Sequence, residues 1–193
     1  WSADGRFAYA ADSAGNEISQ VSLSGRVEKR LTVGPRPVGL TRAGQRMIVA
    51  NSAADSISIL TREKQHLLPA GRVPYMLAIT PDGKLAVVGN RLPTGDASDP
   101  ASSATVTLLD LRLGNPTVHV RLPPNSTNVH GVAVSPDGRW AYVVHNLARA
   151  MLPTEQIEFG WINANAMTVI DLQRRRRYAT ILLDRLNEGA ANP

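Results

Sequence analysis

SPDGRWAYVVHN, at residues 135–146, joins a tight-turn sequence to a strand-like run and is the most informative segment of this 193-residue chain. Pro136 presets φ at the second turn position, the Asp137 side chain can bond back to the turn backbone, and Gly138 accepts the left-handed conformation that closes a hairpin. Related turns occur three more times, as SADGR at 2–6, TRAGQ at 41–45 and TPDGK at 80–84. The turn glycines are 39, 39 and 55 residues apart, which indicates an internal repeat.

Strand-like segments complete each repeat. An apolar segment follows every turn, and a second segment then alternates apolar and small polar residues, as in TVTLLDL at 105–111. A third strand comes next, and a short apolar strand precedes each turn, as in GVAV at 131–134. Four short strands in about forty residues are typical of a propeller blade, so we predict an all-β β-propeller of about four four-stranded blades. We place these blades, within one domain, at residues 1–37, 38–74, 75–129 and 130–193.

The segment at 135–146 resembles the YVTN-type β-propeller repeat of bacterial surface and periplasmic proteins. The resemblance covers essentially the whole chain, and the second blade departs most, with Arg42 and Ala43 where Pro-Asp is usual. It implies a periplasmic or cell-surface location. It also implies a ring of seven or eight blades, of which this chain is a fragment, and a closed four-bladed ring is the alternative.

A second and narrower resemblance begins at His145, runs through Asp171 and continues at Leu183-Asp184 and at GAANP, residues 189–193. These segments are similar to bacterial propellers that accompany, or are fused to, c-type cytochromes of the di-haem peroxidase kind. The resemblance implies a c-type cytochrome as the protein partner and a c-type haem elsewhere in the full polypeptide. We expect no cofactor within these 193 residues.

The composition excludes several kinds of site. The chain has no cysteine, so it cannot form disulfides, thiolate metal sites or a covalent haem attachment. Its longest apolar runs, such as 181–183, are too short to cross a bilayer, so we expect no transmembrane segment. The net charge of +5 includes an arginine run at 174–177. We interpret this run as a solvated turn and expect no nucleic acid partner, because no aromatic platform accompanies it.

Two blades are longer than the repeat. The third blade carries extra residues at about 91–103, and the fourth at about 147–163, between the second and third strands of each. We expect both insertions on one face of adjacent blades, where added loops commonly bind partners. The insertion in the fourth blade contains five apolar candidates for partner binding: Met151, Leu152, Ile157, Phe159 and Trp161. Such side chains either pack onto their own blades or dock a partner, and the sequence leaves both readings open.

Two histidines on this face are candidate metal ligands. If the hairpin turns at Pro136–Gly138, His130 and His145 are cross-strand neighbours near the central channel. The alternative is that they only line the channel, because two histidines are too few for a metal site.

The chain lacks the common nucleophile, phosphate-loop and zinc-protease motifs, and we assign no catalytic residue. The sequence therefore favours a non-catalytic binding or scaffold propeller in an electron-transfer context. The alternative is a propeller enzyme or enzyme subunit, such as a lactonase or the heavy chain of a quinoprotein amine dehydrogenase.

Overall fold

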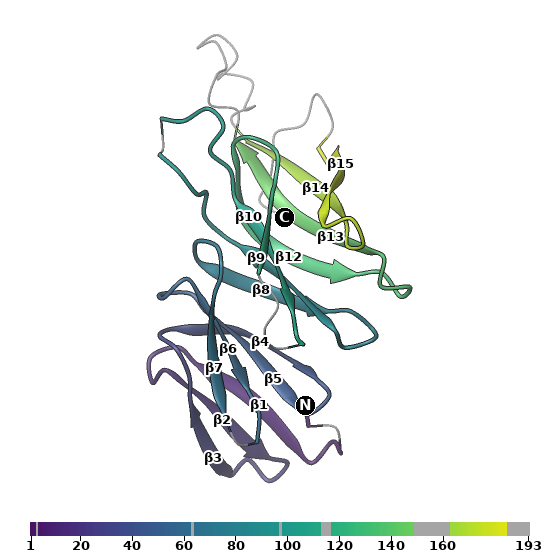
Figure 1. Ribbon diagram of the computed structural model, residues 1–193. Helices are drawn as coiled ribbons and strands as arrows, with labels where there is room; N and C mark the ends of the chain where they lie inside the picture. The colour runs from purple at the N-terminus through teal and green to yellow at the C-terminus, as the bar shows by residue number, and fades with distance from the viewer. Residues whose placement is uncertain (3, 63, 97, 113–116, 149–162, 185–193) are drawn as a thin grey trace.

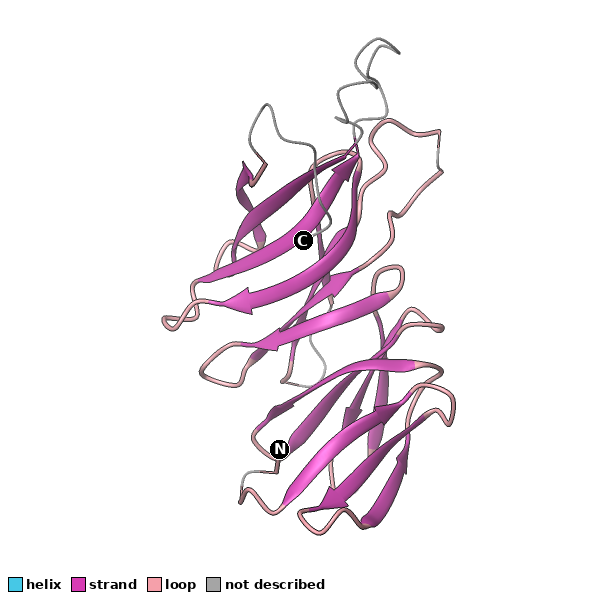
Figure 2. Ribbon diagram, turned by 180° about the vertical axis from the view of Figure 1, so that it is seen from behind, coloured by secondary structure: helices cyan, strands magenta, loops and turns pink. Residues whose placement is uncertain are grey.

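The computed structural model describes residues 1–2, 4–62, 64–96, 98–112, 117–148 and 163–184. Every regular element in these residues is a β-strand, and the strands form four antiparallel sheets that follow one another in chain order (Figures 1 and 2). Each sheet is an up-and-down meander, because consecutive strands are always neighbours. This arrangement confirms the predicted all-β propeller blades.

The four sheets are the blades. The first contains β1 (Phe7–Asp12), β2 (Glu17–Ser22) and β3 (Val27–Thr32). The second contains β4 (Pro37–Ala43), β5 (Arg46–Asn51), β6 (Ser56–Leu60) and β7 (Gln65–Pro69). The third contains β8 (Pro74–Ile79), β9 (Leu85–Asn90), β10 (Thr105–Asp110) and β11 (Val118–Arg121). The fourth contains β12 (Ser126–Val134), β13 (Trp140–Ala148), β14 (Asn163–Asp171) and β15 (Arg176–Leu182). The described part of the first sheet has three strands, and the other sheets have four.

The repeated turns form as their sequences predict. In the third blade, the Thr80 hydroxyl donates to Asp82 Oδ1 at 2.6 Å and the Lys84 N–H donates to the same oxygen at 3.1 Å. The hydrogen bond from Thr80 lowers the pKa of Asp82 below its usual value. Gly83 has φ of 69°, the left-handed conformation that this turn requires. The second blade lacks the Pro-Asp pair, and there a shorter hairpin connects Ala43 directly to its ladder partner Arg46.

The core lies between consecutive blades. Ile48, Ile57 and Ile59 of the second blade are fully buried in one cluster with Val88 and Leu109 of the third. Alternate residues of β9 and β10 point the other way and are buried against the fourth blade in a separate cluster. Each inner blade therefore buries both faces, which explains why β10 is buried along its whole length.

Candidate partner-binding face

The two insertions leave the third and fourth blades at the same end, which we call the insertion face. Asn128 donates its N–H to the Arg91 carbonyl at 2.6 Å, and Asn125 donates to the Ser102 carbonyl at 2.8 Å. The Ala148 N–H in turn donates to the Asn125 carbonyl at 3.0 Å. The start of β12 therefore touches both the β9–β10 connection and the end of β13.

Part of the material predicted as insertion is strand. β13 continues through Ala148 and β14 begins at Asn163, so both strands have 9 residues, whereas β9 and β10 have 6. The longer ladder pairs Leu147 with Ala164 and Ala148 with Asn163. The fourth blade therefore extends further than the third at this end (Figure 1). Its five predicted partner-binding residues, Met151, Leu152, Ile157, Phe159 and Trp161, lie outside the described residues.

A continuous series of side-chain hydrogen bonds crosses the insertion face, and we call it the polar chain: Arg91, Asn128, Asn146, Asn165 and Asp184. Arg91 Nε donates to Asn128 Oδ1 at 2.9 Å, and Asn128 Nδ2 donates to Asn146 Oδ1 at 2.9 Å. Asn146 Nδ2 donates to Asn165 Oδ1 at 2.8 Å, and Asn165 Nδ2 donates to Asp184 Oδ1 at 3.0 Å. Each amide both accepts and donates, which fixes its orientation.

The polar chain is held in place by burial as well as by hydrogen bonds. Asn146 and Asn165 are each only 7% exposed, and a buried amide is costly unless its polar atoms are paired. Because the polar chain connects the end of β9 with the ends of β13 and β15, it holds the bases of both insertions together. Sequence reasoning missed it, because its members are far apart along the chain and belong to no recognisable motif.

His130 lies at the edge of the polar chain. It is half-buried, and its Nε2 is 3.3 Å from Asn146 Oδ1. His130 sits in a β-bulge of β12, between the ladder pairs Thr127–Asn146 and Gly131–Val144. β8 has an irregularity at the same place, and there Tyr75 lies under the Arg91 guanidinium, 5.0 Å from the ring centroid. Bulges of this kind redirect a side chain at the end of a strand.

His145 occupies a different environment. It is fully buried, with Nδ1 3.1 Å from the Asn146 carbonyl oxygen and Nε2 2.8 Å from Thr168 Oγ1. Burial lowers the pKa of His145 below its ordinary value of 6.5, which favours the neutral ring. The hairpin turns where the sequence predicts, with Gly131 paired to Val144 and Val134 to Ala141, and the ladder is interrupted next to this stretch, so no ladder pair joins His130 to His145.

The metal-binding role of His130 and His145 stays a prediction. The two rings bond to different partners, Asn146 for one and Thr168 for the other. Within the described ranges, no three His, Asp or Glu side chains are grouped closely enough to hold a metal ion.

His145 replaces an asparagine that the second and third blades share. Asn51 and Asn90 are both fully buried, and each donates from Nδ2 to a hydroxyl on the next strand, Ser58 at 2.9 Å and Thr107 at 2.9 Å. His145 lies at the same distance from its turn glycine and bonds to the equivalent hydroxyl, Thr168. Its position therefore indicates a structural role in the fourth blade.

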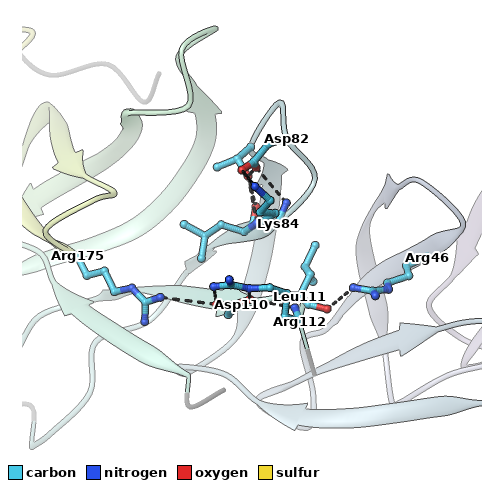
Figure 3. Close-up of polar contacts among 9 residues, drawn as sticks. Arg46, Asp82, Lys84, Asp110, Leu111, Arg112 and Arg175 are labelled. Carbon is cyan, nitrogen blue, oxygen red and sulfur yellow. Dashed lines mark hydrogen bonds and ion pairs between the residues drawn. The ribbon is translucent and has the colours of Figure 1, made fainter. Parts of the chain in front are cut away.

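At the opposite end of the blades, arginine side chains contact groups of the neighbouring blade (Figure 3). Asp110 has a side chain only 3% exposed and accepts hydrogen bonds from Arg112 Nε at 3.0 Å and Nη2 at 2.6 Å. Arg175 of the fourth blade approaches the same carboxylate at 3.8 Å, and Arg46 of the second blade donates to the Leu111 carbonyl. This end therefore stabilises the contacts between blades.

We expect the substitution Asp110→Ala to lower the free energy of unfolding by about 2 kcal/mol, because the Arg112 N–H and guanidinium lose a buried acceptor. Urea denaturation measures the effect. The matched control is Asp82→Ala, which removes an exposed turn carboxylate within one blade and should cost less. Equal losses in the two variants would contradict the larger contribution expected of the buried Asp110 carboxylate.

Comparisons with known proteins support the fold. No protein-family model matches the chain, so the YVTN assignment stays a prediction. The chain is 31% identical over 125 residues to the hydrazine synthase subunit beta of Kuenenia stuttgartiensis, a match that covers 62% of this chain and 29% of the relative. The chain therefore spans less than a third of the length of that relative.

Two solved structures extend the likeness to nearly the whole chain. A Kuenenia stuttgartiensis hydrazine synthase structure matches with a TM-score of 0.55 and 21% identity, over 98% of this chain and 66% of its own. A putative 6-phosphogluconolactonase from Bacteroides uniformis matches with a TM-score of 0.57 and 14% identity, over 98% and 57%. At these identities the likeness establishes the propeller fold alone. The described residues contain no helix long and apolar enough to cross a membrane.

Proposed function

We propose that this chain is a non-catalytic scaffold propeller that docks a partner protein on its insertion face. The observation that carries the proposal is the polar chain, which ties the bases of the two insertions together from Arg91 to Asp184. Loops that bind partners are commonly presented by a rigid scaffold, and this arrangement supplies one.

The chemistry of the described residues favours binding over catalysis. The side-chain amides of Asn128 and Asn146 each accept one hydrogen bond at Oδ1 and donate one from Nδ2 to another protein group. Both ring nitrogens of His145 are likewise engaged, and its lowered pKa keeps it neutral. A catalytic acid or base needs a side chain that can reach a substrate, and these residues are committed to the fold.

We propose a c-type cytochrome as the partner, in the periplasm or at the cell surface. Two observations support this choice: the resemblance of the fourth blade to propellers that accompany such cytochromes, and the similarity of this chain to a protein named as a subunit of an enzyme. The apolar side chains of the fourth insertion supply the contact, because central aromatic residues contribute most of the energy in many protein interfaces.

The double substitution Phe159→Ala and Trp161→Ala tests this proposal. Immobilised wild-type and variant proteins are exposed to a periplasmic extract, and retained proteins are stained for covalent haem on a denaturing gel. We expect the wild type to retain a haem-stained protein and the variant to retain at least about tenfold less, since loss of two aromatic anchors costs roughly 2 kcal/mol or more.

The matched control removes exposed apolar side chains from other blades, Leu23→Ala with Leu67→Ala, which are 73% and 58% exposed. It should retain the haem-stained protein as the wild type does. The proposal fails if no haem-stained protein is retained by the wild type, or if the loop variant retains as much of it as the control.

A further inference from the structure

Two hollows meet along β11, the outermost strand of the third blade. The first opens towards the second blade and is lined by Asp55, Arg72 and Thr94 among others. The second opens towards the fourth blade and is lined by Ser103 and by the β15 end of the arginine run, 175–177. His119 and Arg121 line both hollows. The two hollows adjoin along this shared edge and touch the second, third and fourth blades, and we call them together the basic groove.

The ionised side chains in the second hollow are all positively charged. Arg121 comes from the third blade, and Arg176 and Arg177 come from the fourth, so the fold gathers them from separate segments. None of these three arginines forms an ion pair with another described residue. The second hollow has no carboxylate in its lining. Like charges brought together in this way create a positive potential that attracts an anionic ligand.

One carboxylate, Asp55, lies in the lining of the first hollow, and Asp110 lies outside the lining of both hollows. Asp55 accepts a hydrogen bond from the Val73 N–H at 2.7 Å, and Asp110 is held by Arg112 and approached by Arg175. Neither carboxylate forms an ion pair with Arg121, Arg176 or Arg177, so these three arginines stay available to a ligand. His119 adds a donor or acceptor, because only its Nδ1 is occupied, by Thr107 Oγ1 at 3.0 Å.

The shape and lining of the groove favour an extended acidic peptide. A ligand that fills both hollows crosses β11 and contacts three blades, which a single small anion does not do. Val120, Leu122 and Pro124 supply an apolar floor in the second hollow, against which the stems of acidic side chains can pack. The lining contains no Phe, Tyr or Trp, the residues on which nucleic acid bases stack.

We propose that the basic groove binds an extended acidic segment of a partner protein. This site shares no residue with the polar chain. It can therefore be present whether or not the insertion face docks a cytochrome.

Fluorescence anisotropy with a labelled peptide of alternating glutamate and glycine tests the proposal on the whole chain. We expect binding at about 0.1 M salt that weakens as salt is added, because exposed charges are screened beyond about 10 Å. The triple variant R121Q, R176Q and R177Q should bind about tenfold more weakly, since it loses three charge contacts. A peptide of alternating glutamine and glycine should bind neither protein.

The control variant R26Q, K29Q and R62Q removes the same net charge from the exposed surface of the first two blades. It should change the affinity by less than about twofold, because its charges are distant from the groove. Three outcomes overturn the proposal: equal losses in the two variants, equal binding of the two peptides, or tighter binding of a single-stranded oligonucleotide than of the acidic peptide.

Discussion

The Gly39→Ala variant is expected to lose about 3 kcal/mol of its free energy of unfolding. A Cβ at position 39 would overlap the carbonyl oxygen of Tyr75 on β8, the innermost strand of the next blade. A backbone atom cannot move aside as a side chain can, so the inner strands β4 and β8 must separate, and overpacking of this kind costs about 1–3 kcal/mol or more. Urea denaturation followed by circular dichroism measures the loss.

The matched control is Gly131→Ala. Gly131 pairs with Val144 at the position in the fourth blade that Gly39 and Ala50 occupy in the second. A Cβ there would lie 4.0 Å from its nearest neighbour, which is ordinary contact, and Gly131 does not have positive φ. We expect no loss, or a gain of up to about 1 kcal/mol from the reduced freedom of the unfolded chain. Similar losses in both variants would contradict the close approach of β4 to β8.

Substitution of His145 should produce the second large effect. His145→Leu leaves the Asn146 carbonyl without its ring partner and removes a hydrogen bond to Thr168, so we expect a loss of about 1–3 kcal/mol. His145→Asn should be less harmful, because Asn51 and Asn90 fill the same position in the second and third blades. Thermal unfolding of the two variants at one pH compares them. If asparagine proves as harmful as leucine, the equivalence of these positions is wrong.

Replacement of His145 should also change how the free energy of unfolding depends on pH. Burial lowers the pKa of His145 in the folded state, so below its ordinary value of 6.5 the unfolded chain binds a proton that the folded chain does not. The contribution of His145 to stability is therefore full above about pH 6.5 and is lost as the pH falls from there towards the lower folded pKa.

Unfolding free energies measured across that pH interval should thus fall more steeply for the wild type than for His145→Asn. The other three histidines are present in both proteins and cancel in the comparison. Parallel profiles would show that the ring of His145 titrates normally in the folded protein.

Local sequence signals predicted the blades well, because each signal acts within one hairpin. The Asp-Gly turns and the alternation of TVTLLDL depend on a few adjacent residues, and the structure forms both. Even the departure in the second blade, where Arg42-Ala43 replaces Pro-Asp, has a local result, the short hairpin from Ala43 to Arg46.

The role of His145 could also have been found in the sequence. Asn51, Asn90 and His145 each lie seven residues after their turn glycines, Gly44, Gly83 and Gly138. The motif YVVHN directs attention to Asn146 instead, because it ends in asparagine. The spacing from the turn glycine shows that His145 occupies the position of the buried asparagines Asn51 and Asn90. Asn146 lies one residue further along the strand.

The sequence by itself thus determined the turns, the strands and the order of the blades, since these depend on backbone preferences of neighbouring residues. Only the tertiary structure decided which distant residues meet. A bulge interrupts the β12 ladder between Thr127 and Gly131, where His130 lies, and the extended ladder of β13 and β14 brought Asn146 beside Asn165. The packing of one blade on the next then placed Arg91 against Asn128 and Arg121 near Arg176. These contacts depend on strand register and on contacts between blades, which no local pattern encodes.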